Sequence, residues 1–575
     1  MSVEKLITDH IDIWSSALQT RSTAGRGSNG KIDLYGIKKL RELILELAVR
    51  GKLVSQDPND EPASELLKRI AAEKAELVKQ GKIKKQKPLP EISEDEKPFE
   101  LPEGWEWVRL GDAVEVINGR AYKKQEMLQS GTPLLRVGNL FTSNEWYYSD
   151  LELDEDKYID RGDLIYAWSA SFGPFIWQGD KVIYHYHIWK LKLFSESSLS
   201  RFFLHDYLAS ITEKIKSQGN GIAMLHMTKE RMEKQVIAFP PLEEQINIVS
   251  KIKELMSLCD QLEHQALTSM DAHQQLVETL LGTLTDSQNA EELTENWARI
   301  SQHFDTLFTT EASIDALKQT ILQLAVMGKL VPQDPNDEPA SELLKRIEQE
   351  KAQLVKEGKI KKQKPLPPVS DEEKPFELPI GWEWIRLGSL CEFITSGSRG
   401  WNQFYSNEGS TFIRSQDIKH DRLDFDNRAY VKLPLNTEGT RTRVELGDLL
   451  MTITGGNVAK VAVIDLELED AYVSQHVALI RLVYKAVNSY IHTWLICEHG
   501  GRKNLLELSY GAKPGLNLKN INDLLIPFAP KKQQEKILMR INELMSLCDN
   551  LNVVLKSAQQ TQLHLADALT DAALN

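Results

Sequence analysis

Two kinds of hydrophobic pattern alternate along the chain. Residues 34–53 place apolar side chains at helical spacing up to Gly51, and residues 63–81 continue that pattern after the turn sequence QDPNDEP. Residues 104–240 and 381–530 instead hold short alternating runs rich in tyrosine, tryptophan and β-branched side chains, such as DLIYAW and AYVSQHVALIRLVY. Such runs predict strands. The pattern therefore predicts helical segments that flank two mixed helix-and-sheet domains.

Each strand-rich segment ends at a proline, where a long helix is predicted to begin. In both helices the apolar positions step by four and three residues, which is typical of a coiled-coil seam. The seam positions are Ile248, Ile252, Leu255, Cys259, Leu262 and Ala266 in the first helix, and Ile537, Ile541, Leu544, Cys548, Leu551 and Leu555 in the second. A helix over residues 242–284 is about 65 Å long at 1.5 Å per residue. That length indicates a spacer rather than a core helix.

Much of the helical part occurs twice. The letters QDPNDEPASELLKRI stand at residues 56–70 and again at 333–347, 277 positions later. A second duplicate, ELMSLCD, stands at 254–260 and 543–549, 289 positions apart, so the parts between the markers differ in length by 12 residues. We infer that a duplicated scaffold holds two related domains with different surfaces. The two copies of the scaffold would bind the same partner, one copy of it each, and the two domains would bind two different targets.

The fold class that follows is α+β, a pseudo-two-fold tandem repeat in which long antiparallel coiled-coil helices separate two mixed α/β domains. The predicted divisions are an N-terminal helical scaffold with its connector (1–103), a first domain (104–241), a central helical scaffold with its connector (242–380), a second domain (381–530) and a C-terminal helix (531–575). Each connector carries the run GKIKKQK, followed by EISEDEK or VSDEEK. Because these acids balance the lysines, we interpret the connector as a solvated segment rather than a phosphate clamp.

Composition is typical of a multidomain globular protein. The chain has 575 residues, of which 41% are hydrophobic and 26% charged. Its net charge of −14 argues against a general polyanion binder. However, residues 104–240 carry 16 basic against 18 acidic side chains, and residues 381–530 carry 16 against 17. The acid is concentrated in the repeated parts, so the two domains are able to present local basic faces.

The sequence contains neither a membrane segment nor a metal motif. No run approaches the roughly 18 apolar residues of a membrane span, and the N-terminus lacks the apolar core of a secretory signal. The four cysteines, Cys259, Cys391, Cys497 and Cys548, form no CxxC pair, so buried, reduced thiols are expected rather than a zinc site. We therefore expect a cytoplasmic protein without a bound metal.

The order of motifs resembles a known family. GWEWVRLGD, RVGNL, GDLIYAWSASFG and HMTKERMEKQVIAFPPLEEQINIVSKI follow one another in the first half, and the second half ends in LNLKNINDLLIPFAPKKQQEKIL. This arrangement is similar to the specificity (S) subunit of Type I restriction–modification systems. The N-terminal extension with DPNDEPASELLKRI resembles the type IB branch. The resemblance covers nearly the whole chain.

The resemblance implies a non-catalytic subunit that recognises double-stranded DNA. Two target recognition domains would each recognise one half of a bipartite, asymmetric sequence, and the helical scaffold would dock two methyltransferase (M) subunits. The M subunits would methylate adenine with S-adenosylmethionine, and restriction (R) subunits would add translocation and cleavage with ATP and Mg. This chain would need no cofactor of its own. Two unlike domains on one scaffold fit an asymmetric target, because identical halves would recognise a palindrome.

Two other classes of protein explain less of the sequence. A single-chain methyltransferase would need an NPPY-like loop and a glycine-rich cofactor turn, and an ATP-driven motor would need a GxxxxGK[ST] phosphate loop; none occurs. EDEK and DEEK hold the carboxylates and lysine of a metal nuclease, but they lie in proline-rich connectors with no strand scaffold to hold a metal. A purely protein-binding helical adaptor would explain the duplicated scaffold but not two different aromatic-rich domains. A DNA-recognition subunit accounts for both.

Polar loops at strand ends supply the candidate DNA contacts of the first domain. Lysine and arginine bind phosphates, while arginine, asparagine and glutamine pair with base edges. The candidates are Arg120, Tyr122, Lys123 and Lys124 in NGRAYKKQEM, Arg136 and Asn139 in RVGNL, Trp168, Ser169 and Ser171 in YAWSASFG, and Asn220 and His226 in SQGNGIAMLHMT. Ordinary solvated loops are the alternative for each. His185 and His187 share a strand face, but no third metal ligand is near them in sequence.

The second domain offers a different set of candidates. Its sharpest stretch, TSGSRGWNQFY, combines an arginine, an aromatic ring and an amide in one glycine-flanked loop. The candidates are Ser398, Arg399, Trp401 and Asn402 in that loop, Arg414 and Gln416 in FIRSQDI, Thr454, Asn457 and Lys460 in MTITGGNVAK, Gln475 and His476 in VSQHV, and Lys513 and Asn517 in YGAKPGLN. Which of these residues would contact bases and which would contact phosphates stays open.

Overall fold

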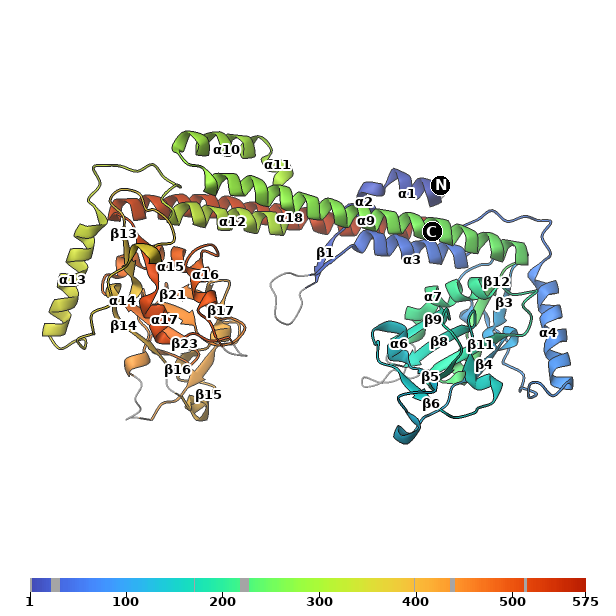
Figure 1. The fold of residues 1–575 in the computed structure, drawn as a ribbon. Coiled ribbons are helices and arrows are strands. Elements are labelled where there is room, and N and C mark those ends of the chain that lie inside the picture. Colours follow the sequence, from blue (N-terminus) through green and yellow to red (C-terminus); the bar gives the residue numbers. More distant parts are fainter. Residues whose placement is uncertain are drawn as a thin grey trace. The chain divides into compact units, whose positions relative to one another are not determined.

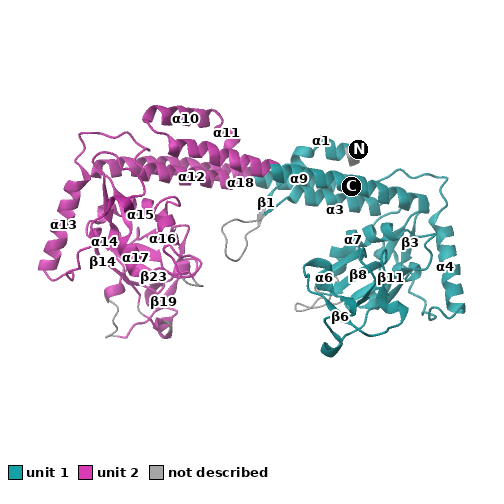
Figure 2. Ribbon diagram, viewed as in Figure 1, with its two compact units in different colours: residues 1–23, 29–268, 559–575 teal, residues 24–28, 269–558 magenta. Residues whose placement is uncertain are grey.

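The chain forms two compact units, and each joins helices to a strand domain. The computed structural model describes residues 3–21, 31–169, 171–217, 227–397, 399–434, 440–510 and 514–574. Unit 1 comprises residues 1–23, 29–268 and 559–575, and unit 2 comprises residues 24–28 and 269–558 (Figure 2). Two long helices, α9 (Leu242–Asp286) and α18 (Lys531–Leu574), contribute residues to both units.

Shorter helices complete the helical part; Figure 1 draws most of them along the two long ones, but α4 and α13 beside the strand domains. In unit 1 they are α1 (Val3–Asp9), α2 (Ile11–Ser16), α3 (Tyr35–Val49) and α4 (Ala63–Lys79), and in unit 2 they are α10 (Ala290–Gln302), α11 (Phe304–Leu307), α12 (Glu311–Val326) and α13 (Ala340–Lys356). In unit 2, Val277 and Leu281 from the end of α9 pack in one core with Ile537 and Ile541 from the start of α18. The end of α9 and the start of α18 therefore share one core.

The duplicated scaffold keeps the same contacts in both units. Arg41 of α3 donates to Asp260 of α9 at 2.6 Å, and Lys318 of α12 donates to Asp549 of α18 at 2.7 Å. The first five seam positions of α9 and the first four of α18 are buried. The apolar stripe of each long helix therefore packs as the sequence pattern predicts. Equivalent ion pairs join α3 to α9 in unit 1 and α12 to α18 in unit 2.

The strand domain of unit 1 contains two four-stranded sheets. One has the antiparallel order β4–β11–β8–β9, and the other has the order β6–β5–β10–β7, in which β5 and β10 are parallel. The strands are β3 (Glu106–Arg109), β4 (Val114–Asn118), β5 (Thr132–Leu135), β6 (Tyr147–Ser149), β7 (Tyr158–Ile159), β8 (Leu164–Ser169), β9 (Ser171–Ile176), β10 (Val182–Tyr184), β11 (Ile188–Leu193) and β12 (Val236–Phe239). The strand β3 pairs with β12, and a further pair, β1 (Gln19–Arg21) with β2 (Lys31–Asp33), precedes α3. The helices of the domain are α5 (Leu110–Ala113), α6 (Val137–Phe141), α7 (Arg201–Ser217) and α8 (Lys229–Glu233).

Unit 2 repeats this plan. Its sheets are β14–β23–β20–β21 and β15–β19–β16–β22, with β16 and β22 parallel, together with the pairs β13–β24 and β17–β18. The strands are β13 (Glu383–Arg386), β14 (Cys391–Ser396), β15 (Tyr405–Ser406), β16 (Ser410–Ile413), β17 (Ile418–Lys419), β18 (Arg422–Leu423), β19 (Ala429–Val431), β20 (Leu449–Thr452), β21 (Val461–Val463), β22 (Ala471–Val473), β23 (Val477–Leu482) and β24 (Leu525–Phe528). The helices are α14 (Leu387–Leu390), α15 (Asn488–Ile496), α16 (Gly501–Glu507) and α17 (Leu518–Asp523).

The observed architecture confirms the predicted fold class. Helices and sheets are mixed, two long helices are present, and one strand-domain plan occurs twice. All four cysteines are buried, and burial raises the pKa of each thiol. Of the helices that the structure describes, none combines the length and the apolar character needed to cross a bilayer.

Candidate nucleic-acid interface

Several strand ends of unit 1 meet at one edge of its domain, and most of the predicted contacts of the first domain lie there. The strands β5 and β10 are parallel and end in register, so Arg136 and His185 follow them side by side. Arg120, after β4, forms a bridge with His185, and Trp168 of β8 donates its backbone N–H to the carbonyl of His187. Edge 1 consists of residues 119–126, 136–139, 168, 169, 171 and 185–187.

The cationic side chains after β4 differ in their surroundings. The Glu126 carboxylate accepts from Arg120 at 2.8 and 3.1 Å, and this pairing lowers the pKa of the carboxyl. The Arg120 guanidinium also lies 5.1 Å from the ring centroid of Tyr122. Tyr122 is buried, which differs from the expected surface tyrosine, because its ring belongs to a small core beneath the loop. Lys123 and Lys124 are exposed and have no ion-pair partner within the described residues.

After β5, one predicted contact is exposed and the other is used by the fold. Arg136 is exposed and lies over Tyr147, with 5.1 Å between the guanidinium carbon and the ring centroid. The amide oxygen of Asn139 accepts the backbone N–H of Arg136 at 3.1 Å, and its nitrogen donates to the carbonyl of Glu145 at 2.7 Å. Asn139 therefore shapes the start of α6, whereas the guanidinium of Arg136 faces solvent.

Aromatic side chains fill the middle of edge 1. The Trp168 indole stacks on Trp189, with 5.1 Å between ring centroids, and its Nε1 donates to the carbonyl of Tyr186 at 3.0 Å. The rings of His185 and His187 lie 4.8 Å apart, and burial lowers the pKa of His185 to about 4. No set of three or more His, Cys, Asp and Glu side chains is arranged for a metal ion in the part of the chain that the structure describes.

Unit 2 builds an equivalent edge from the same strand ends. At the end of the parallel pair β16–β22, the backbone N–H of Ser474 donates to the carbonyl of Ile413 at 2.8 Å. In unit 1 the backbone N–H of His185 makes the equivalent bond to the carbonyl of Leu135 at 2.9 Å. After β20, Ile453 donates to the carbonyl of His476 at 2.9 Å, which matches the bond from Trp168 in unit 1. Edge 2 consists of residues 397, 399–402, 414–417, 454–457 and 474–476.

Edge 2 holds one arginine tightly and leaves another exposed. Arg414 donates to Asp417 at 2.7 and 3.0 Å, and Asp417 is only 3% exposed. Arg399, in the loop after β14, is exposed and forms no hydrogen bond or ion pair with the described residues. Trp401, expected at the surface, is instead buried and stacks on Phe412 with 5.7 Å between ring centroids. It therefore anchors the loop that carries Arg399.

A polar cleft of about 350 Å³ opens within edge 2. Its lining residues are Ser415, Gln416, Thr454, Gly455, Gly456, Asn457 and His476. The Thr454 hydroxyl lies 2.6 Å from Nδ1 of His476, and the Gln475 amide nitrogen lies 3.1 Å from its Nε2. Gly455 has a left-handed φ of +93°, which favours glycine at this turn. The lining offers hydroxyl, amide, imidazole and backbone groups, which can donate to or accept from base edges.

The other predicted contacts are placed less favourably or lie outside the description. Ser171 and Lys460 are partly exposed, while Ser169 is buried, against expectation, in the β8–β9 hairpin. Asn517 caps α17 because its Oδ1 accepts the backbone N–H of Asn520 at 2.8 Å. Asn220, His226, Ser398 and Lys513 lie outside the described residues, and so does the side chain of Asn402.

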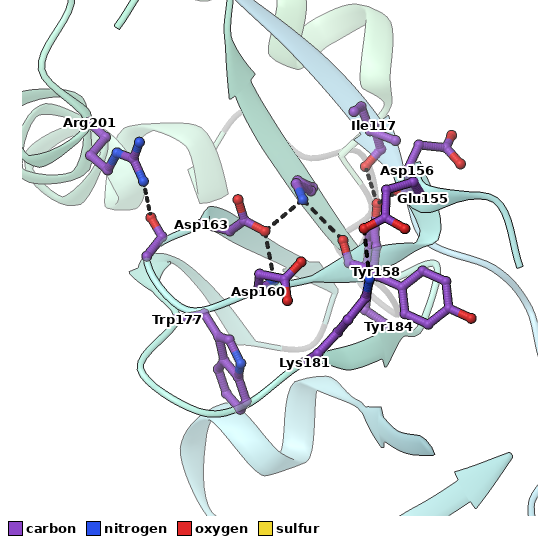
Figure 3. Close-up of polar contacts among 12 residues, drawn as sticks. Ile117, Glu155, Asp156, Tyr158, Asp160, Asp163, Trp177, Lys181, Tyr184 and Arg201 are labelled. Carbon is purple, nitrogen blue, oxygen red and sulfur yellow. Dashed lines mark hydrogen bonds and ion pairs between the residues drawn. The ribbon is translucent and has the colours of Figure 1, made fainter. Parts of the chain in front are cut away.

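The GDL triplet at 162–164, which recurs in unit 2, builds the turn that leads into β8. Its glycine has a left-handed φ of +90°. Asp163 accepts from Lys190 at 2.6 Å and from a backbone N–H at 2.7 Å (Figure 3). In unit 2, Asp448 is held in the same way by Arg481 at 2.7 Å. The triplet therefore fixes the turn at the start of each of these strands, at the strand end opposite the edge.

The two edges differ in which arginine is held by a carboxylate and which is exposed. In edge 1, Arg120 is held and Arg136 is exposed, whereas in edge 2 the arginine after the parallel strand, Arg414, is held and Arg399 is exposed. Sequence reasoning missed the two carboxylates that hold these arginines. Each follows its arginine within the same short loop, and this proximity is the only signal that the sequence offers. Equivalent backbones therefore present different side chains.

Comparison with known proteins identifies the family. The Type I restriction modification DNA specificity domain matches residues 102–270 and 379–557, which are the two strand domains with the helices that follow them. The chain belongs to this family. The Type I restriction enzyme EcoAI specificity subunit of Escherichia coli is 50% identical over 606 residues, and the EcoEI specificity subunit of Escherichia coli is 51% identical over 610. Both alignments cover 100% of each chain.

The solved structures add a more distant likeness. The HsdS subunit from Thermoanaerobacter tengcongensis is 17% identical, with 83% of this chain and 98% of that chain covered and a TM-score of 0.38. Family membership rests on the domain match and on the full-length relatives. As a Type I specificity subunit, the chain is the non-catalytic, DNA-specificity component of its system.

Proposed function

We propose that edge 1 and edge 2 each recognise one half of a bipartite, asymmetric sequence in double-stranded DNA. The observation that carries the proposal is the pairing of equivalent backbones with different side chains. Edge 1 offers an exposed guanidinium together with aromatic side chains, and edge 2 offers an exposed guanidinium together with a polar cleft. Identical edges would select a palindrome, whereas these two select unlike half-sites.

Within each edge we assign base contacts to the exposed arginine. Arg136 and Arg399 have the free bidentate fork that suits the O6 and N7 acceptors of guanine. Lys123 and Lys124 are exposed point charges, which suit phosphates. Gln475, beside the cleft of edge 2, has the amide that suits adenine. Arg120 and Arg414, held by carboxylates, position these loops instead.

The helical scaffold docks the other subunits of the system. Because each unit carries the same scaffold, two methyltransferase (M) subunits bind, one on each unit, and restriction (R) subunits join them. S-adenosylmethionine is bound by the M subunits and ATP with Mg by the R subunits, so this chain carries no cofactor. The complex acts on cytoplasmic DNA. The shared ion pairs of α3 with α9 and of α12 with α18 support this repeated docking.

The test compares the purified chain with the chain assembled with the M subunits of its system. The chain alone is expected to methylate no DNA, and the assembly is expected to methylate one bipartite sequence. Arg136→Ala should relax one half-site and Arg399→Ala the other, each by about 1–3 kcal/mol of base discrimination. Sequencing of the methylated sites measures both effects. Methylation by the chain alone, or equal weakening of both half-sites by either variant, contradicts the proposal.

A further inference from the structure

Each unit carries the same exposed lysine-rich loop. The loops, residues 82–87 and 359–364, are identical in sequence although the domains beside them differ. Each begins after a left-handed glycine, with φ of +70° at Gly81 and +71° at Gly358, that ends the preceding helix. Figure 1 draws α4 and α13, the helices that lead into the loops, each along one side of its strand domain. The loops therefore begin in the same way, after an equivalent helix end, as well as having the same sequence.

The loops are anchored, not free. In unit 1, Ile83 is buried, and Arg109 donates to the backbone carbonyl of Pro90, just beyond the loop, at 3.1 Å. In unit 2, Arg386 donates to the carbonyl of Pro367 at 2.8 Å. Because both ends are fixed, the lysines between them project from a defined place on each unit. Such a fixed array loses less conformational entropy on binding than a flexible tail does.

The carboxylates that follow in sequence do not neutralise these lysines. Glu96 is bound to Arg109 at 2.7 and 2.8 Å, and Glu373 is bound to Arg386 at 2.8 and 2.9 Å. Within the described residues, no ion pair or side-chain hydrogen bond is formed by Lys82, Lys84, Lys85, Lys87, Lys361, Lys362 or Lys364, and all seven are exposed. These seven lysines therefore form no ion pair with the acids that follow them, whereas Lys359, the first residue of the second loop, pairs with Glu357 at 2.9 Å.

The loops lie at the far end of a strand from the recognition edges. Leu89, two residues after the first loop, lies against Gly111 of α5, the short helix that leads into β4. Gln363 of the second loop donates to the carbonyl of Glu392, at the start of β14, at 2.7 Å. Edge 1 and edge 2 begin after the last residues of β4 and β14. Five or six residues of strand, about 16–20 Å at 3.3 Å per residue, separate each loop from its edge. DNA bound at an edge therefore lies at the end of β4 or β14 that is opposite to the lysine loop.

We propose that each lysine loop docks an acidic surface of a protein subunit that binds once on each unit, namely the M subunit. This inference rests on the proposed function, because it requires a partner that binds twice. Because the two loops have the same sequence, we expect one kind of partner to bind in two copies. The seven unpaired lysines are complementary to an acidic surface. Because the loops are distant from the edges, a partner bound there leaves the DNA site unobstructed. DNA phosphates are the competing ligand for the same charges.

The experiment reverses the charge of one loop at a time in the full-length chain. One variant carries Lys84→Glu, Lys85→Glu and Lys87→Glu, and its counterpart carries Lys361→Glu, Lys362→Glu and Lys364→Glu. Native mass spectrometry counts the M subunits bound, and titration at 50 mM and 500 mM salt measures their affinity. Lys123→Glu with Lys124→Glu at edge 1 is the matched control. DNA affinity is measured separately with M subunits at saturating concentration.

Each loop variant is expected to weaken binding of one M subunit about tenfold at low salt, with a smaller effect at high salt. The variant with both loops reversed should weaken both M subunits, and DNA affinity of the saturated assembly should persist. The control should lower DNA affinity without affecting assembly. Loss of DNA affinity with normal assembly would assign the loops to phosphates, and no change in either would leave them as solvated connectors; both results overturn the inference. A wild-type assembly that binds DNA with the same affinity whatever its sequence would instead contradict the proposed function.

Discussion

Asp417 fixes the direction of Arg414 within edge 2. Its two oxygens accept from the guanidinium at 2.7 and 3.0 Å, and one of them also accepts the backbone N–H of Arg414 at 2.8 Å. The carboxylate is buried at 3% exposure. A buried acceptor that serves three donors leaves its arginine little freedom, so Arg414 shapes the loop around the polar cleft.

We expect Asp417→Asn to loosen recognition of the second half-site. The amide replaces one acceptor oxygen by a donor that faces Arg414, and the loss of a charge-assisted bond at a buried site costs about 1–3 kcal/mol of unfolding free energy. Thermal unfolding measures the stability, and sequencing of methylated sites with M subunits present measures the specificity. The first half-site should be unchanged.

Glu126→Gln in edge 1 is the matched variant. Its carboxylate holds Arg120 as Asp417 holds Arg414, so this change should relax only the first half-site. The pKa of Glu126 is lowered by Arg120, so the pair persists at neutral pH and the variant differs from wild type there. If both variants relaxed the same half-site, the assignment of one edge to each half-site would be wrong.

The sequence predicted the backbone plan better than the orientation of individual side chains. The duplicated letters and the 4–3 stripe depend on local spacing, and the structure confirms the packing that they imply. Whether Tyr122 and Trp401 face solvent depends instead on the β5–β10 and β16–β22 pairings, which close small cores beneath the loops. The roles of Glu126 and Asp417 likewise depend on three-dimensional loop closure, which composition does not encode.

Replacing Trp401 by alanine tests the anchor beneath the Arg399 loop. Trp401 is 4% exposed, and its stacking on Phe412 makes it part of a core, so the change should cost about 3–5 kcal/mol of unfolding free energy. The second half-site should relax together with the stability loss. Tyr405→Ala, at a side chain 49% exposed beside the same Phe412, is the control and should have a smaller effect. Equal effects of the two variants would place Trp401 outside the core.

The buried Arg109 and the carboxylate of Glu96 predict a pH-dependent contribution to stability. Hydrogen bonds from Arg109 lower the pKa of Glu96 to about 2, below its ordinary value of 4.5. The contribution is therefore complete above about pH 4.5 and is lost as the pH falls towards 2. Glu96→Gln should lower the unfolding midpoint at pH 7, and the two proteins should converge in acid. Glu94→Gln, which breaks only a surface pair with Lys97, should have little effect. A constant difference at all pH values would exclude this linkage.

Glu244, near the start of α9, is a buried position at which the two units differ. Glu244 accepts from the Trp105 indole at 2.8 Å and from the Gln56 amide at 3.0 Å, and it is 2% exposed. Gln533 stands at the equivalent position of unit 2, but there the Trp382 indole donates to Gln333, at 3.1 Å, and Gln533 donates to the carbonyl of Pro332. Unit 2 therefore shows that the scaffold tolerates a neutral amide at this position.

Glu244→Gln should stabilise the protein at alkaline pH. Burial raises the pKa of Glu244 because the charged form loses its hydration. For an acid whose pKa is raised by folding, stability is lost as the pH rises through the pKa of the folded state, so the penalty is present at pH 8 and absent in acid. The variant should therefore unfold at a higher temperature than wild type at pH 8, with the difference shrinking towards pH 4. Gln533→Glu in unit 2 should do the opposite, because it places a new carboxyl in a buried site that lacks these donors. A stabilising Gln533→Glu, or a Glu244→Gln effect that grows in acid, would show that hydrogen bonding rather than desolvation governs this position.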